Sequence, residues 1–177
     1  MIDIVLPSGN ESSFIEIARR IGVRKLCFLY ERIPSNTYQA PKDIEIITGL
    51  LCSEKDIHKN KGKADVLFLK NPSRKAVEQG IVDCIYGLED TPKDYIHQRG
   101  SGMNHIWAKI MAEKGVIYAF DISLLKSKPV VWARMKQNMK LCKKYGVGFR
   151  ICSFAMLPHQ MISADQMKAI EQELLRG

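Results

Sequence analysis

Strand and helix patterns alternate along the whole chain, and this alternation restricts the fold more than any other feature. Apolar runs of strand length are separated by segments whose apolar residues recur at helical spacing. We expect about seven strands, at 2–6, 25–31, 44–51, 64–69, 81–86, 116–122 and 147–152. Helices are expected at 11–21, 72–79, 101–114, 130–145 and 163–175, and residues 54–63 form either a short helix or a loop.

Alternating strands and helices in one domain are typical of an α/β protein with a parallel sheet. The 177 residues suit a single domain spanning 1–177. Two architectures stay open on the pattern alone. The sheet either closes as an incomplete or distorted TIM-like barrel, or stays open and doubly wound.

The cysteines and the apolar runs indicate an intracellular soluble protein. The longest apolar runs are much shorter than the roughly 20 residues that a membrane-spanning helix needs. No basic region precedes the first apolar stretch, so we expect no signal peptide and a cytoplasmic protein. The five cysteines are widely spaced, and we expect buried, reduced thiols at Cys27, Cys52, Cys84, Cys142 and Cys152.

Positive charge is concentrated in the later part of the chain. Residues 1–60 contain 8 Lys/Arg and 8 Asp/Glu, whereas residues 61–177 contain 19 and 11 and so supply the whole net charge of +8. A localised basic excess is typical of proteins with a polyanionic partner. Many small soluble proteins are equally basic without binding nucleic acid, so charge alone does not decide the function.

The most informative segment runs from Arg99 to Lys109. Gly100, Ser101 and Gly102 lie where a loop enters a helix, and we expect Ser101 to cap that helix and leave its free N–H groups available to a phosphate. His105 and Lys109 share one helical face. The alternative is a glycine-containing loop before an ordinary helix with a solvated polar face.

In a parallel barrel, functional residues collect in the loops after the carboxyl ends of the strands. The acidic residues expected there are Glu31, Glu89, Asp90 and Asp121. The basic ones come from at least three loops and would converge on one face: Lys70, Arg74, His97, Arg99, Lys126, Lys128 and His159. Lysines are common in loops of all proteins, so this convergence depends on the strand assignments.

Catalytic motifs are poorly represented. The four histidines have no partner at metal-ligand spacing, and the chain has neither a P-loop nor a G-x-S-x-G motif. Glu31 and Asp121 could form an acid/base pair, although such residues are more often solvated or structural. We therefore expect no catalytic residue and no metal or cofactor bound by this chain.

Several segments resemble one known family in the same order along the chain. The opening Asp3-Ile4-Val5 to Glu11, the strand Ala64-Asp65-Val66-Leu67, and the stretch from Asn138 to Val147 each match weakly. The block Arg99-Gly100-Ser101-Gly102-Met103-Asn104-His105-Ile106 is more specific and resembles the pattern R-x-S-G-hydrophobic-N-H. The family is ribonuclease P protein component 3 of archaea, which is related to the thirty-kilodalton subunit of the eukaryotic enzyme.

This resemblance implies a TIM-like barrel related to the polymerase and histidinol phosphatase superfamily. It also implies assembly with ribonuclease P RNA, ribonuclease P protein component 2 and other ribonuclease P proteins, with precursor tRNA as an indirect partner. In that enzyme the RNA holds magnesium and cleaves the 5′ leader of precursor tRNA, so the isolated protein is not expected to be catalytic. The alternative is a stand-alone, metal-dependent barrel phosphoesterase.

The expected RNA contacts follow from the resemblance and the basic loops together. Arginine and lysine would anchor phosphates, because helical RNA is recognised mainly through its shape and backbone. The candidates are Arg99, His105, Lys109, Lys70, Arg74, Lys126 and Lys128, with Ser101 and Gly102 as the phosphate site at the helix start. The chain departs from the family in its short length and at 153–159, where an arginine-containing loop is usual, so an RNA contact from that loop is in doubt.

Overall fold

The computed structural model describes residues 1–35, 41–90, 100–126 and 128–176. In these ranges the strands are β1 (Ile2–Val5), β2 (Lys25–Tyr30), β3 (Glu45–Leu51), β4 (Val66–Lys70), β5 (Cys84–Tyr86), β6 (Ile117–Asp121) and β7 (Phe149–Cys152). The α-helices are α1 (Glu11–Arg20), α2 (Ile57–Asn60), α3 (Arg74–Glu78), α4 (His105–Lys114), α5 (Val130–Tyr145) and α6 (Ala164–Leu175). Two 3₁₀ helices, η1 (Ile122–Lys126) and η2 (Pro158–Gln160), were not expected from the sequence.

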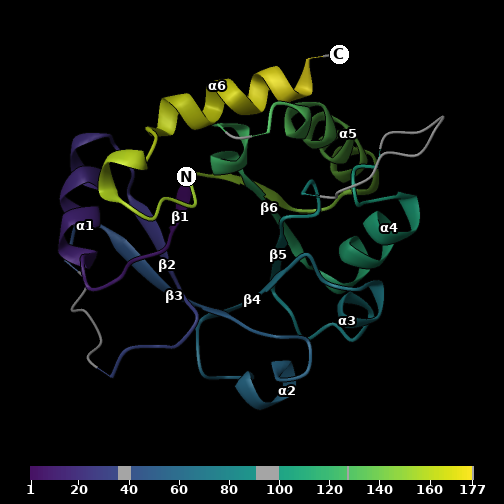
Figure 1. The fold of residues 1–177 in the computed structure, drawn as a ribbon, viewed down its shortest axis with the longest axis horizontal. Coiled ribbons are helices and arrows are strands. Elements are labelled where there is room, and N and C mark those ends of the chain that lie inside the picture. The colour runs from purple at the N-terminus through teal and green to yellow at the C-terminus, as the bar shows by residue number, and fades with distance from the viewer. Residues whose placement is uncertain (36–40, 91–99, 127, 177) are drawn as a thin grey trace.

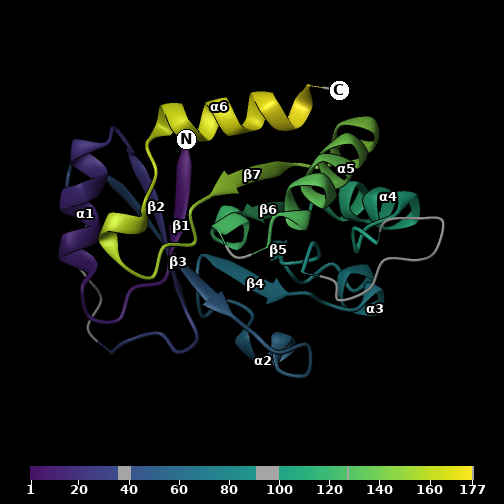
Figure 2. The same ribbon diagram turned by 45° about the horizontal axis from the view of Figure 1, so that its top comes forward.

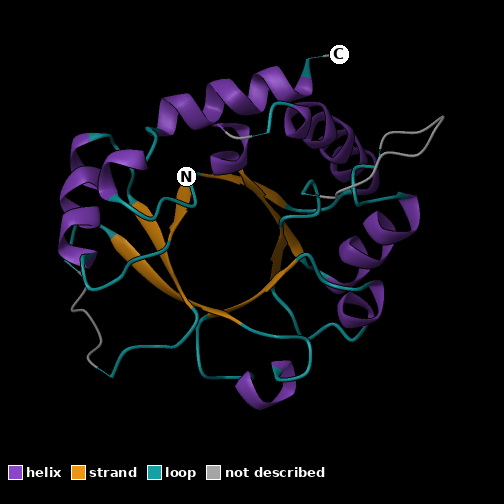
Figure 3. Ribbon diagram, in the orientation of Figure 1, coloured by secondary structure: helices purple, strands orange, loops and turns teal. Residues whose placement is uncertain are grey.

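The strands form one parallel sheet in the order of the sequence, from β1 to β7. A doubly wound sheet would reverse its strand order at a switch point, and this sheet does not. The strands curve around a common axis, and the helices form a ring outside them (Figures 1 and 3). The expected α/β fold is confirmed as a TIM-like, nearly closed barrel.

The first and last strands meet through a short junction rather than a full ladder. Val5 and Ala155 form an isolated parallel bridge, and the Leu6 N–H donates to the Ala155 carbonyl at 2.8 Å. The buried Asp3 carboxylate accepts hydrogen bonds from the backbone N–H and the hydroxyl of Ser153 at 2.6 and 2.7 Å. Burial raises the pKa of Asp3 to about 6, although both bonds from Ser153 act in the opposite direction.

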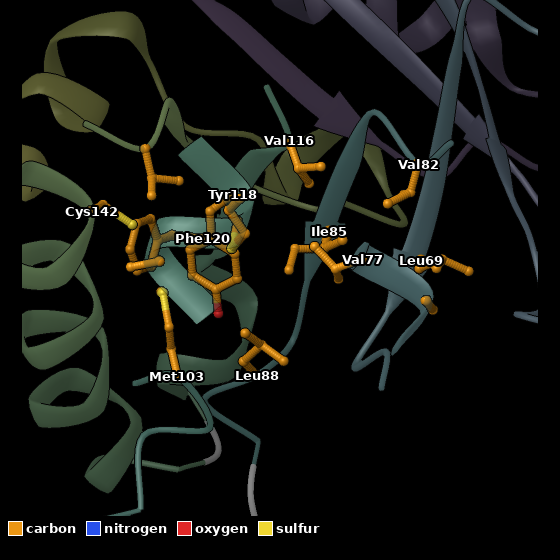
Figure 4. Packing of buried hydrophobic residues seen from close by; sticks show 14 of the residues in the cluster. Leu69, Val77, Val82, Ile85, Leu88, Met103, Val116, Tyr118, Phe120 and Cys142 are labelled. Carbon is orange, nitrogen blue, oxygen red and sulfur yellow. The ribbon is translucent and has the colours of Figure 1, made fainter. Parts of the chain in front are cut away.

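The core has separate layers inside and outside the barrel wall. Outside, β4, β5 and β6 pack against the helices from α2 to α6, and Figure 4 shows Ile85, Tyr118 and Phe120 in this layer. A smaller cluster lies beneath α1. The interior is lined by side chains from all the strands, which range from small ones such as Ala119 and Cys152 to aromatic ones such as Phe68.

All five cysteines are buried and free, as expected. Burial raises the pKa of the Cys27 and Cys142 thiols to about 12, so both are neutral and serve as small apolar side chains. Among the described residues, no helix combines the length and the apolar character of a membrane span.

Candidate functional site

An aromatic pair closes the carboxyl end of the barrel. Tyr86 is the last residue of β5, and its ring stacks on Phe154, which follows β7, with centroids 4.6 Å apart. Lys70, the last residue of β4, places its ammonium 6.0 Å from the Tyr86 centroid. Asn71 donates its backbone N–H to the Tyr86 carbonyl at 2.8 Å. We call Lys70, Tyr86 and Phe154, with Asp121, the barrel mouth.

The backbone beside this pair is strained. Asn71 and Phe154 have φ of 46° and 47°, and they are the non-glycine residues with positive φ in the described ranges. Both contact Tyr86, through a backbone hydrogen bond and through ring stacking. Such strain persists only where the surrounding contacts determine the conformation, and here those contacts hold the aromatic closure in place.

The carboxylates at the barrel mouth already have partners. Asp121 accepts hydrogen bonds from the Ser123 N–H and hydroxyl at 2.9 and 2.6 Å. Burial raises the pKa of Asp121, and these bonds and the nearby Lys70 partly offset that effect. Burial, with the charges of Asp121 and Glu31, raises the pKa of Tyr86 to about 12. Within the described ranges, no three His, Cys, Asp or Glu side chains are grouped as metal ligands.

Several of the expected RNA contacts near the barrel mouth are paired with carboxylates of the chain itself. Lys128 forms an ion pair with Asp90, and Arg74 pairs with Glu78 through Nε and Oε1 at 2.8 Å. His159 is exposed on η2. His97, Arg99 and the side chain of Lys126 lie outside the described part of the structure.

The expected helix start at Ser101 is wrong. Helix α4 begins at His105, and the cap is Asn104, whose side-chain oxygen accepts the N–H groups of Ile106 and Trp107 at 3.0 and 3.1 Å. Ser101 is only 2% exposed, and its hydroxyl donates to the Met103 carbonyl at 3.1 Å. Ser101 therefore lies in the loop before the helix, where it has no free helical N–H groups beside it. Phosphate binding at Ser101 and Gly102 stays a prediction.

Gly102 is required by a close backbone approach. Its φ is 78°, and a Cβ at this position would lie 2.2 Å from the Leu88 carbonyl oxygen. A side chain would thus be both strained and in collision with backbone. The glycine of the Ser101-Gly102 pair serves packing between the loop after β5 and the entry to α4.

Buried polar side chains of α5 hold this entry. Asn138 donates from Nδ2 to the Ser101 carbonyl at 2.8 Å and to Glu89 Oε1 at 3.3 Å. Arg134 donates to the Glu89 carbonyl at 3.0 Å. Burial raises the pKa of Glu89 to about 7, and the neighbouring Tyr118 and Asn138 side chains partly counter the shift. These contacts fasten the residues on both sides of 91–99 to α5.

The other expected contacts lie on the flank of the barrel and not at its mouth. Lys109 is exposed on α4, and its ammonium lies 6.0 Å from the ring centroid of Tyr145 at the end of α5. Lys144 approaches the same ring at 5.5 Å. His105 is exposed at the first position of α4. These two residues are thus separate from Lys70 and Arg74, which lie at and after the end of β4.

Four lysines of α5 were not singled out from the sequence. Their helical spacing could have been recognised in the sequence, because they lie on the side of the helix opposite the buried residues Val131, Met135, Met139 and Cys142. They are Lys136, Lys140, Lys143 and Lys144. Helices α4 and α5 lie side by side on the outside of the barrel in both ribbon orientations (Figures 1 and 2).

The hollow of the barrel opens at the amino ends of the strands. A cavity of about 750 Å³ is lined there mainly by apolar side chains, among them Ile2, Val66 and Phe68, with Lys25 and Arg150 also in its lining. At the carboxyl end, the buried Tyr86 and Phe154 rings stack on each other.

Comparisons with known proteins identify the fold. No family model and no curated protein matches the chain. Among solved structures, the chain is similar to a protein chain in the cryo-EM structure of archaeal ribonuclease P with mature tRNA, at 19% identity and a TM-score of 0.75, covering 99% of this chain and 83% of that one. It is also similar to histidinol phosphate phosphatase from Lactococcus lactis subsp. lactis, complexed with zinc, L-histidinol and phosphate, at 9% identity and a TM-score of 0.59, covering 99% and 94%. The chain therefore has the α/β barrel fold that is found both in a ribonuclease P chain and in that phosphatase.

Proposed function

We propose that this chain is a protein subunit of ribonuclease P that supports the catalytic RNA in removing the 5′ leader of precursor tRNA. One observation carries the proposal: nearly the whole chain matches a chain of archaeal ribonuclease P, with a TM-score of 0.75 over 99% of its length. The net charge of +8 supports an RNA partner.

In this proposal the chain acts by binding and assembly. Its partners are ribonuclease P RNA, ribonuclease P protein component 2 and other ribonuclease P proteins, and precursor tRNA is engaged indirectly. Lys70, Lys109 and His105 are exposed and suited to phosphate contacts. Arg74 and Lys128 would first have to leave their carboxylate partners, and Arg99 and Lys126 complete the proposed set.

The chemistry is assigned to the RNA, which would hold the magnesium ions. The barrel mouth supports a non-catalytic role for the protein, because the Tyr86–Phe154 stack fills the place where barrel enzymes usually bind substrate. Asp121, the buried carboxylate at this end, is hydrogen-bonded to Ser123 and so is poorly placed to act as a free base.

Reconstitution of the enzyme tests the proposal. The chain, component 2 and ribonuclease P RNA should co-purify and cleave precursor tRNA faster than the RNA with component 2 alone. Cleavage that is unchanged when the chain is omitted would contradict the proposal. Hydrolysis of a phosphoester by the chain with added metal and no RNA would instead support the stand-alone phosphoesterase.

A further inference from the structure

We infer that the outer surface of α4 and α5 is a second surface, besides the contacts proposed near the barrel mouth, that binds the phosphate backbone of helical RNA. The inference rests on the proposed function for the identity of the polyanion. It extends the proposed contacts beyond the expected set, because only Lys109 and His105 of the expected residues lie on these helices. We call Lys109, Lys136, Lys140, Lys143 and Lys144 the lysine surface.

Helices α4 and α5 hold most of the net positive charge of the chain. Helix α4 contains Lys109 and Lys114 with one acidic residue, Glu113. Helix α5 contains no acidic residue and has Arg134 and four lysines. The neighbouring α6 has the opposite balance, with Asp165, Glu171 and Glu173 against Lys168, and so borders the basic surface on one side.

The charges of the lysine surface are not neutralised within the described part of the chain. None of the five ammonium groups lies within 4.0 Å of a described carboxylate. Some cations elsewhere have such partners, as in Arg19–Asp43 at 2.6 Å, Lys25–Glu45 at 2.6 Å and the pair of Lys128 with Asp90. A row of uncompensated lysines is unfavourable by mutual repulsion, and a bound polyanion would relieve it.

The lysines also form a regular row. Lys136, Lys140 and Lys144 are four residues apart, which places them about 6 Å apart along one side of the helix. The opposite side of α5 is buried against the barrel, so the row faces outward. The Tyr145 ring lies under the ammonium groups of both Lys109 and Lys144, and joins the row on α5 to α4.

The surface suits a duplex better than a single strand. Proteins that bind single strands stack bases on exposed aromatic rings. The large apolar side chains that are exposed in the described ranges are Met1, Ile106, Val130, Met156 and Leu157, none of which is aromatic. Helical RNA is bound through its backbone without stacking, and a row of lysines on a rigid helix meets that requirement.

The test compares two sets of four substitutions in the whole chain. The first replaces the four lysines of α5 by Gln, which keeps the helix propensity close to that of Lys: K136Q, K140Q, K143Q and K144Q. The control removes the same charge from the exposed segment around α2, on another side of the barrel (Figure 1): K55Q, K59Q, K61Q and K63Q. The probe is a fluorescently labelled RNA hairpin, and its affinity is measured over a range of salt concentrations.

RNA affinity falls as the salt concentration rises from about 50 to about 200 mM, and each phosphate contact adds to this fall. Without four contacts, the fold-decrease in affinity over this range should be about 100 times smaller. The α5 variant should show this reduced sensitivity and the α2 control should keep the slope of the unmodified chain. Equal losses in both variants would overturn the inference, because net charge and not the surface would then explain binding. An α5 variant identical to the unmodified chain would also overturn it and leave the proposed function intact.

A single-stranded RNA that binds more tightly than the hairpin would contradict the assignment to helical RNA. If the unmodified chain binds no RNA at all, both the inference and the RNA-binding role fail.

Discussion

Replacing Glu89 by Gln should remove a pH dependence from the stability of the protein. Glu89 is fully buried between Tyr118 and α5, and its pKa is raised from 4.5 to about 7, mainly by burial. The folded state therefore holds a proton that the unfolded state releases above about pH 4.5, so stability falls as the pH rises towards 7 and then stays constant. For these two pKa values the loss between about pH 5 and pH 8 is on the order of 2 to 3 kcal/mol.

The E89Q variant keeps the shape of the side chain and the acceptor for Asn138 while it removes the titration. Urea unfolding followed by tryptophan fluorescence at both pH values gives the free energies. The unmodified chain should lose about 2 to 3 kcal/mol more than E89Q over this interval. Asp3, whose pKa is raised to about 6, contributes the same change to both proteins and cancels in the difference. If the free energy of unfolding changed with pH in the same way for both proteins, the buried Glu89 would not be the cause of the pH dependence.

Two further substitutions test the entry to α4. G102A should destabilise the fold by at least about 2 kcal/mol more than G62A. Both glycines have φ near 80°, but only a Cβ at Gly102 would collide with the Leu88 carbonyl oxygen. Equal unfolding free energies of the two variants would show that the loop moves away from Leu88 without cost. N104A should lower the free energy of unfolding by about 1 kcal/mol, because it leaves two first-turn N–H groups of α4 without their cap. S101A should lower it by less. If chemical denaturation gave the reverse order, Ser101 and not Asn104 would be the cap.

The strands of the barrel were predictable from the sequence because their apolar runs are continuous. Each strand is buried on both sides, by the barrel interior and by the helices, so runs such as Val66–Leu69 mark it without ambiguity. The pattern of strands and helices did not predict closure into a barrel, which was expected only from the family resemblance. Closure depends on contacts such as those of Asp3 with Ser153, which are far apart in the sequence.

The start of α4 shows where local signals fail. Ser101 and Asn104 are both good capping residues, and the sequence alone does not rank them. The tertiary structure decides, because Asn138 binds the Ser101 carbonyl and Gly102 packs against Leu88, which leaves Asn104 to cap the helix.

The basic residues show a related limit. The sequence indicates which loops are basic, but the pairing of Lys128 with Asp90 joins positions 38 residues apart and depends on the fold. The row on α5 was visible as a spacing of four, although such a spacing is equally typical of a solvated helix face. Its meaning depends on the absence of ion pairs between these lysines and the described carboxylates, and this emerges only from the fold.

Isolation of the chain from the cells that produce it tests the central claim most directly. A tagged copy, expressed at its natural level, is purified under low-salt conditions, and the bound RNA is sequenced. The account predicts strong enrichment of ribonuclease P RNA, with cleavage of precursor tRNA by the purified complex. Recovery of the chain without ribonuclease P RNA and without this activity would contradict the account.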